Sequence, residues 1–252
     1  DRVLQILEAV GASREGKTHR ELASSLRIPK SSLSLLLSNL SDREYLSLHS
    51  TNRRYVLGPQ VLALASGYLS GLDIVRLGQP ILKKITRAID ESAEIAIKTG
   101  EEIMVISKED CARPLARMIQ IGERAPMYAT AGGKAILAYL PEEEIDRYFS
   151  SVQLRAVTRA TITDKKQLWA QFRSIRSGAV ARSNEELYEG VTAVACPVFD
   201  FHGRVVASIV IPSLTLRINT QKKKRIENLL RIASMELSRL LGFNTRPSSV
   251  GV

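Results

Sequence analysis

The chain has 252 residues, more than one domain of ~100–150 residues needs, so its length favours two domains. An apolar fraction of 44% and a charged fraction of 25%, with 15 glycines and 9 prolines, are typical of a packed globular protein and exclude collagen-like, coiled-coil and disordered chains. The longest apolar stretch, near 205–212, is shorter than the ~20 residues of a membrane helix, and no charged-then-apolar leader opens the sequence, so we expect a soluble, cytoplasmic protein. The net charge of +10 favours a polyanionic partner, either nucleic acid or an anionic membrane surface.

The first segment carries apolar residues at helical spacing. Val3, Ile6 and Val10 line one face of a predicted amphipathic helix. A Thr-x-x-Glu capping box opens a second, short helix at 18–26, in which each end residue can satisfy the other's backbone amide. Pro29 interrupts this helix but suits the first position of a third one. The third helix has a predicted buried stripe of Leu33, Leu36, Leu37 and Leu40.

Alternation around a polar tip predicts a β-hairpin at 46–57. Helix, capped helix, tight turn, helix and basic hairpin are, in this order, typical of a winged helix-turn-helix DNA-binding domain, here over residues 1–58. Arg53 and Arg54 at the tip of the wing would neutralise phosphates. A plain helical bundle with a solvated run of charges is the competing interpretation, which the capping box, the proline turn and the wing together disfavour. The candidate DNA-binding residues are Thr18, His19, Arg20, Lys30, Ser31, Ser32, Ser34, Arg53 and Arg54.

The remaining sequence predicts a linker helix followed by a mixed α and β domain. The helix at 59–72 is more apolar than a linker in water tolerates, so we expect it to pack on another chain or on the first unit, and a homodimer is the simplest arrangement. A domain follows over 73–242, and residues 243–252 form a frayed tail. We expect strands at 94–99, 103–106, 117–121, 179–183, 192–200 and 204–211, and helices at 74–89, 129–140, 141–149, 164–177 and 226–241.

Several ordered motifs of the chain carry a resemblance to a known family. They are the capping-box helix at 18–26, the turn and third helix at 29–33, the tract Tyr128-Ala129-Thr130-Ala131-Gly132-Gly133-Lys134-Ala135, Thr161-Ile162-Thr163-Asp164, the stretch from Asn184-Glu185-Glu186 to Gly190-Val191, and the segments 195–200 and 203–207. Each is weak alone, but in this order and spacing, from about Val3 to Leu241, the chain resembles the IclR family of bacterial transcription regulators.

The resemblance implies an α+β fold with an N-terminal winged helix-turn-helix and a C-terminal GAF-like mixed α/β domain that binds a small organic effector. It also implies homodimers or dimers of dimers on double-stranded operator DNA, with no membrane partner. Two departures matter: Leu35 stands where the family commonly has arginine, and Glu44 where it often has glycine. The first removes an expected DNA contact, so the operator sequence of relatives does not transfer to this chain.

An effector site is indicated by the tract 130–133, which precedes a helix and offers backbone amides and the positive end of the helix dipole to a carboxylate. Close packing of its two glycines is the alternative. A phosphate-binding loop is disfavoured because Tyr128 and Ala135 stand where glycine and Ser or Thr are needed. Val210 and Pro212 replace hydroxyl-bearing residues of some relatives, so we expect a larger or aromatic carboxylate rather than a very small keto acid. The resemblance implies that the effector-binding residues are Met118, Thr130, Ala131, Gly132, Ser183, Val191, Ala193, Val210 and Pro212.

No metal site, cofactor or catalytic set is predicted. His19, His49 and His202 are scattered without metal-ligand spacing. Cys111 and Cys196 form no disulfide or metal pattern, and Cys196 in its apolar strand fits a small buried hydrophobe.

Two other functional classes stay open. An enzyme would use groups such as Glu185 and Glu186, but adjacent carboxylates on a turn are expected to be solvated. A ligand-sensing adaptor with impaired DNA binding gains weight from Leu35. The basic run at 222–225 could touch DNA or acidic lipid, although a solvated turn is favoured.

Overall fold

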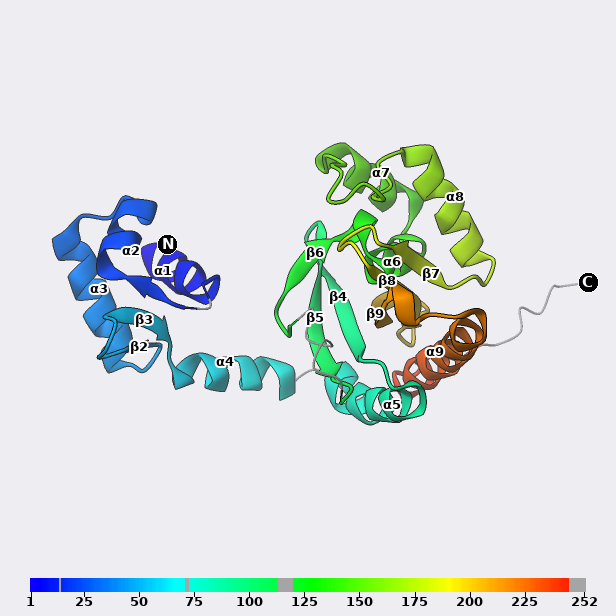
Figure 1. Cartoon of the computed structure of the whole chain (residues 1–252), viewed down its shortest axis with the longest axis horizontal. Coiled ribbons are helices and arrows are strands. Elements are labelled where there is room, and N and C mark those ends of the chain that lie inside the picture. The colour runs from blue at the N-terminus through cyan, green and yellow to red at the C-terminus, as the bar shows by residue number, and fades with distance from the viewer. Residues whose placement is uncertain (14, 71–72, 113–119, 245–252) are drawn as a thin grey trace, which may run out of the picture. The chain divides into compact units, whose positions relative to one another are not determined.

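The computed structural model describes residues 1–13, 15–70, 73–112 and 120–244. The chain divides into two compact units, Asp1–Gly71 and Leu72–Val252, each with its own buried core (Figure 1).

Helices and a small sheet make up the first unit. Its elements are α1 Arg2–Gly11, β1 Lys17–Thr18, α2 His19–Leu26, α3 Lys30–Asp42, β2 Leu46–Leu48, β3 Arg54–Leu57 and α4 Pro59–Ser70. Ile6, Leu22, Leu33 and Leu37 form the centre of the core, and the antiparallel pairing of β2 with β3 confirms the predicted wing. Strand β1 pairs with the other side of β3 and was not predicted, because two residues are too few to show an alternating pattern.

The ends of the helices follow local signals in the sequence. The capping box is confirmed: the Thr18 hydroxyl accepts from Glu21 N at 3.2 Å, and Thr18 N donates to the Glu21 carboxylate at 2.7 Å. Pro29 lies at the N-cap of α3, one position earlier than predicted. Glu44, the departure from the family's glycine, has a φ of 59°, a region where a side chain costs about 1–2 kcal/mol, which explains the glycine of relatives.

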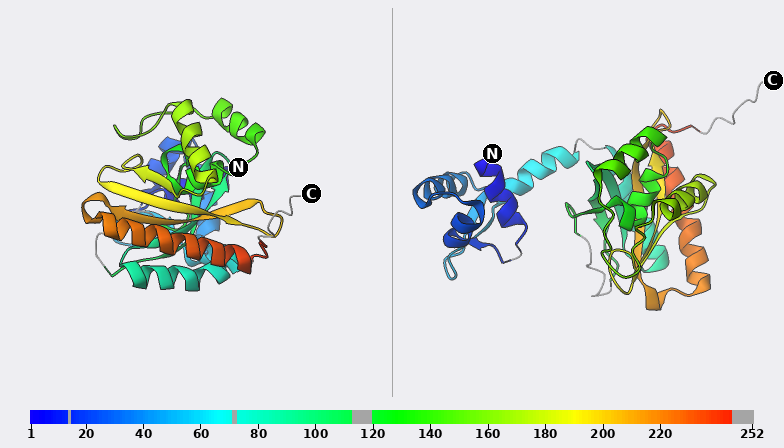
Figure 2. Two further views of the ribbon diagram at one scale, coloured as in Figure 1. Left: turned by 90° about the vertical axis from the view of Figure 1, so that its right-hand side faces the viewer. Right: turned by 90° about the horizontal axis from the view of Figure 1, so that it is seen from above.

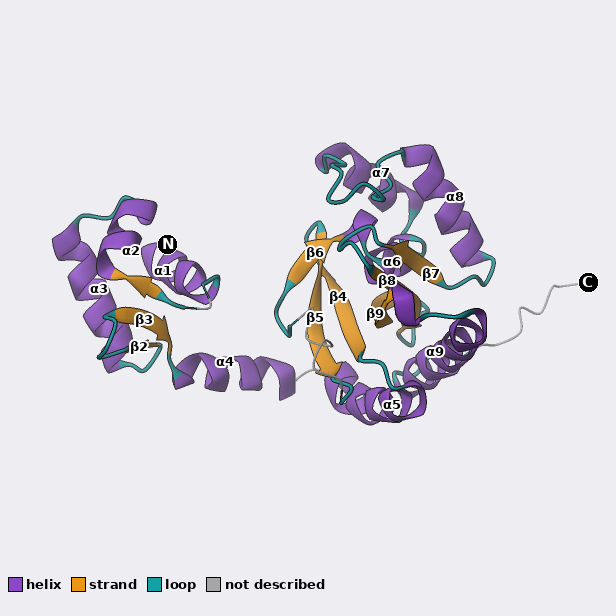
Figure 3. Ribbon diagram, in the orientation of Figure 1, coloured by secondary structure: helices purple, strands orange, loops and turns teal. Residues whose placement is uncertain are grey.

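The second unit is built on one antiparallel sheet with helices on both faces (Figures 2 and 3). Its elements are α5 Asp73–Ile89, β4 Ala93–Thr99, β5 Glu102–Glu109, β6 Arg124–Pro126, η2 Met127–Ala129, α6 Ala131–Leu137, α7 Glu142–Ser151, α8 Lys165–Arg176, β7 Ala181–Asn184, β8 Val191–Phe199, β9 Val205–Leu214, η3 Thr215–Arg217 and α9 Thr220–Leu240. The strand order is β6-β5-β4-β9-β8-β7. Helices α5 and α9 lie side by side against one face, while α6 covers the other, with α8 packed on α6.

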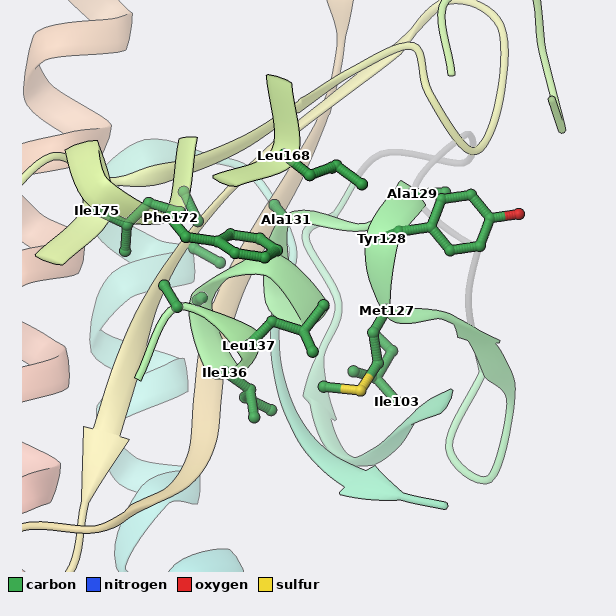
Figure 4. Packing of buried hydrophobic residues seen from close by; sticks show 14 of the residues in the cluster. Ile103, Met127, Tyr128, Ala129, Ala131, Ile136, Leu137, Leu168, Phe172 and Ile175 are labelled. Carbon is green, nitrogen blue, oxygen red and sulfur yellow. The ribbon is translucent and has the colours of Figure 1, made fainter. Parts of the chain in front are cut away.

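Successive residues of the central strands face the helix layers on opposite sides of the sheet. Val210 of β9 lies against Gly132 of α6. Ile209 is paired across the strands with Ile95, which packs against Gly78 of α5. Helix α6 is buried along its whole length, and the side chains around it fill the core between the sheet and α8 (Figure 4).

Most predicted elements of this unit are confirmed to within a few residues, and two are corrected. The strand predicted at 117–121 falls partly on 117–119, outside the described residues, while Gln120 and Ile121 lie before and in a turn and the strand is Arg124–Pro126. The helix predicted at 129–140 is the shorter α6, preceded by η2. A polar N-cap at Thr130 separates the two, and helical periodicity does not reveal that boundary. Over the residues described, no helix has both the length and the apolarity to cross a bilayer.

Candidate DNA-binding surface and effector cavity

The N-terminal half of α3 presents polar side chains to solvent. Lys30, Ser31 and Ser34 are exposed, and Ser32 is half-buried beside them. The Ser34 hydroxyl donates to the Lys30 carbonyl at 2.9 Å and lies 2.9 Å from His19 Nε2. Helix α2 therefore contacts α3 through this pair, and the predicted residues of the two helices share one surface.

The two arginines of the wing have different surroundings. Arg53 is exposed at the tip, with a φ of 54°. Arg54 is only partly exposed because its guanidinium donates to the Glu21 carboxylate at 3.1 and 3.3 Å and to the Gly16 carbonyl at 2.9 Å. The hydrogen bond from Thr18 N and the charge of Arg54 hold the pKa of Glu21 below its ordinary value. Arg53 is thus the freer side chain of the two, and Arg54 joins the wing to the capping box of α2.

The predicted effector residues of α6, β7, β8 and β9 meet at one cavity. It lies between the start of α6, the sheet face that α6 covers and the loop after β7. The volume of this cavity is about 40 Å³. Of the predicted residues, Met118 lies outside the described part of the chain, and the cavity is lined by Thr130, Ala131, Gly132, Ser183, Val191, Ala193, Val210 and Pro212.

Four further residues line this cavity and were missed in the sequence. They are Glu94, Ile103, Leu187 and Tyr188. Alternation did not reveal Glu94, since it places this residue with Lys98 on the face opposite Ile95 and Ile97, whereas both faces of this part of β4 are buried in the structure. Tyr188 lies on an irregular loop, where no periodicity predicts the direction of a side chain.

Close packing explains why glycines stand at positions 132 and 133. A Cβ on Gly133 would lie 2.3 Å from the backbone of Met127, and one on Gly132 would lie 2.8 Å from Val210 Cγ2. The Gly133 amide also donates to the Thr130 hydroxyl at 3.1 Å. The structure therefore supports close packing at both glycines and occupies one of the amides that the sequence offered to a carboxylate.

A buried ion pair holds the cavity's two sides together. Lys134 of α6 is fully buried, and its Nζ lies 2.6 Å from both carboxylate oxygens of Glu186. Burial lowers the pKa of Lys134, an effect that the Glu186 charge opposes. Glu186 is 2% exposed, so the expectation that it is solvated is wrong. The pair connects α6 to the loop that carries Leu187 and Tyr188.

A larger cavity, of about 280 Å³, lies on the opposite face of the sheet near the start of α9. Arg182 and Lys223 line it, together with hydroxyl and amide side chains. Arg182 is already paired with Glu227 at 2.5 Å. None of the predicted effector residues borders this cavity, so it is a separate feature of the unit.

Histidine and cysteine side chains form no catalytic or metal set in the described residues. No group of three or more His, Cys, Asp or Glu side chains there could hold a metal ion. Cys196 is buried in β8, as predicted, and burial raises the pKa of its thiol to about 12.

Two family models match the chain over both units. The IclR helix-turn-helix domain matches residues 1–49, and the C-terminal domain of the bacterial transcriptional regulator IclR matches residues 66–239, more than half of the chain. The chain belongs to the IclR family.

Individual IclR-family members agree with this assignment. The chain is 28% identical over 247 residues to the transcriptional regulator KdgR of Escherichia coli, covering 98% of this chain and 93% of KdgR. It is 27% identical over 226 residues to KipR of Bacillus subtilis, covering 90% of each chain. The crystal structure of Thermotoga maritima IclR is similar with a TM-score of 0.81 at 26% identity, over 96% of this chain and 98% of that one. These named relatives are transcriptional regulators.

Proposed function

We propose that this IclR-family regulator binds operator DNA through α3 and the wing, and that a small organic acid in the α6 cavity controls this binding. The observation that carries the effector half of the proposal is the convergence of separately predicted residues, from α6 and three strands, on one cavity. The regulator acts on double-stranded DNA in the cytoplasm, without a membrane partner.

The character of the cavity favours an effector with an apolar body. Ile103, Leu187, Val191, Val210 and Pro212 are apolar residues of its walls. An aromatic carboxylate fits such walls, and an IclR homologue from Microbacterium hydrocarbonoxydans, which shares this fold with a TM-score of 0.82 at 19% identity, was crystallised with 4-hydroxybenzoate.

The small volume of the cavity explains how an effector would control DNA binding. Its free space of about 40 Å³ holds a few water molecules, since each needs about 10–15 Å³. An aromatic acid therefore enters only when the walls move apart, and it favours the conformations in which they have done so. Effector binding thereby changes the shape of the second unit, which the DNA-binding unit can sense through the chain or through a second subunit.

A self-association surface is part of the proposal. Leu62 and Leu64 of α4 are 74% and 65% exposed, and such apolar residues on a helix favour contact with another chain. We expect a homodimer or a dimer of dimers, which would read two half-sites of one operator.

One observation favours a second candidate function. Leu35 is 72% exposed on α3, where relatives commonly carry arginine. A regulator without that arginine could have lost specific DNA binding and serve as a ligand-sensing adaptor. Leu35 is equally suited to contact the methyl group of a thymine in the major groove, so DNA reading remains the preferred function.

Selection of bound duplexes from a genomic DNA pool at near-physiological salt, read by sequencing, tests the proposed function. We expect an enriched palindrome whose half-site spacing reports the distance between two DNA-binding units. Absence of any enriched sequence, from a folded and oligomeric protein, would favour the adaptor.

The wing makes a separate prediction. Replacing Arg53 by alanine is expected to weaken binding to all duplexes alike and to reduce the slope of log affinity against log salt by about 1, because one phosphate contact is lost. Fluorescence anisotropy over a salt series measures both quantities. Arg159→Ala, which removes an equally exposed arginine from the second unit, is the control and should change neither quantity. Equal affinities for Arg53→Ala and the unaltered chain would disprove the phosphate contact of the wing.

A further inference from the structure

Glu94 is a carboxylic acid inside the effector cavity. It lies on β4, directly across the strands from Val210 on one side and Lys108 on the other, and borders the cavity. Its residue surface is 2% exposed, and no donor of the described chain lies within hydrogen-bonding distance of Oε1. Most buried polar atoms of folded proteins are paired, so an unpaired carboxyl oxygen at a cavity wall indicates a partner other than the residues that the structure describes.

The groups around Glu94 do not supply that partner. The Lys108 ammonium is 2.9 Å from the Asp110 carboxylate, and the Tyr188 hydroxyl donates to the Glu123 carboxylate at 3.2 Å. Burial, reinforced by the charges of Asp110 and Glu123 and opposed by Lys108, raises the pKa of Glu94 to about 8. At neutral pH the side chain is therefore mostly an uncharged carboxyl group, which can donate one hydrogen bond and accept others.

A second unpaired polar atom lies near Glu94, on the neighbouring strand β9. Ser208 of β9 is fully buried, and no hydrogen-bond partner is present for its hydroxyl within the chain as described. It lies across the strands from Ala96, two residues along β4 from Glu94 and on the same face, beside the position of Gly132. Two unsatisfied groups therefore lie on one face of the β4–β9 pair, and one of them, Glu94, borders the cavity.

We propose that Glu94 determines the specificity of the effector cavity, which selects an organic acid that also carries a hydroxyl or amino group and donates a hydrogen bond from it to the Glu94 carboxyl group. This inference rests on the proposed function and narrows its effector class. Such a group satisfies Oε1, whereas an acid without a donor buries the oxygen unpaired. Because leaving a buried acceptor unpaired costs about 1–3 kcal/mol, the donor raises affinity by about tenfold or more.

Matched probes test the donor requirement directly. Calorimetric titration of the full chain would compare benzoate with para-hydroxybenzoate, meta-hydroxybenzoate and para-aminobenzoate, and pyruvate with lactate. We expect at least one donor-bearing acid to bind about tenfold or more tightly than its partner. In Glu94→Leu this ratio should fall to about one, while Glu94→Gln, which keeps an acceptor oxygen, should retain part of it.

The control is Glu143→Gln on the exposed side of α7, which should leave every ratio unchanged. Equal affinities for the acids with and without a donor in every pair would overturn the inference while leaving effector control in place. An affinity ratio that persists in Glu94→Leu would do the same. Failure of every probe to bind would also overturn it. The proposed function is then judged by the duplex selection, which needs no effector.

Discussion

Replacing Lys134 by methionine is expected to destabilise the second unit by about 3–5 kcal/mol, because it leaves the buried Glu186 carboxylate without its counter-charge. The backbone amides of Ile162 and Asn184, both 3.4 Å from the carboxylate, are too distant to compensate. Urea unfolding followed by Trp169 fluorescence measures the effect. Trp169 is the single tryptophan and packs against Phe172 in the second unit, so its signal reports this unit alone.

A surface ion pair provides the matched control. Lys84 lies 3.6 Å from Glu236, and the two side chains are 74% and 42% exposed, so Lys84→Met should cost less than about 1 kcal/mol. The double variant Lys134→Met with Glu186→Leu should recover much of the lost stability, because no charge is left buried. If Lys134→Met costs no more than Lys84→Met, the buried pair does not anchor the loop to α6.

Glu94→Gln is expected to change how the stability of the second unit depends on pH. The unfolded carboxyl loses its proton near pH 4.5, whereas the folded one keeps it until about pH 8, so the folded state binds the extra proton between these values. The contribution of the Glu94 proton to the free energy of unfolding is therefore fully present below pH 4.5. Between pH 4.5 and pH 8 this contribution falls by about 1.4 kcal/mol per pH unit, and above pH 8 it no longer changes. Over the whole window the loss is about 5 kcal/mol.

The neutral glutamine has no proton to lose, so the free energy of unfolding of Glu94→Gln should exceed that of the unaltered chain increasingly from pH 4.5 to 8. Urea unfolding at a series of pH values, again read from Trp169, gives the difference curve. Glu143→Gln removes an exposed carboxylate and should follow the unaltered chain. Parallel curves for Glu94→Gln and the unaltered chain would mean that Glu94 is ionised in the folded protein.

Local signals in the sequence predicted the parts of the fold that depend on neighbouring residues. The capping box at Thr18 involves partners three positions apart, and the wing involves one hairpin. The contacts of Lys134 with Glu186 and of Arg54 with Glu21 join residues far apart in the chain. No spacing rule connects such residues, so their partners became visible only in the folded structure.

The family resemblance supplied the α6, β7, β8 and β9 residues that line the cavity, although their role as effector ligands stays a prediction. Glu94 differs, since the resemblance did not indicate it and strand alternation groups it with Lys98, opposite Ile95 and Ile97. A charged residue inside an apolar strand conflicts with burial, and such conflicts mark functional sites. Tyr188 depends on the path of an irregular loop, for which the sequence holds no comparable signal.

The contact between Arg54 and Glu21 limits the movement of the wing in the free protein. It joins the wing to α2 in the free protein, so in the DNA binding that we propose the wing has less freedom to lose and the entropic penalty of association is smaller. Both side chains are partly exposed, and dissolved ions screen their attraction. Raising the salt concentration therefore weakens this contact in the free protein, while in the complex that we propose counterions also compete for the phosphates.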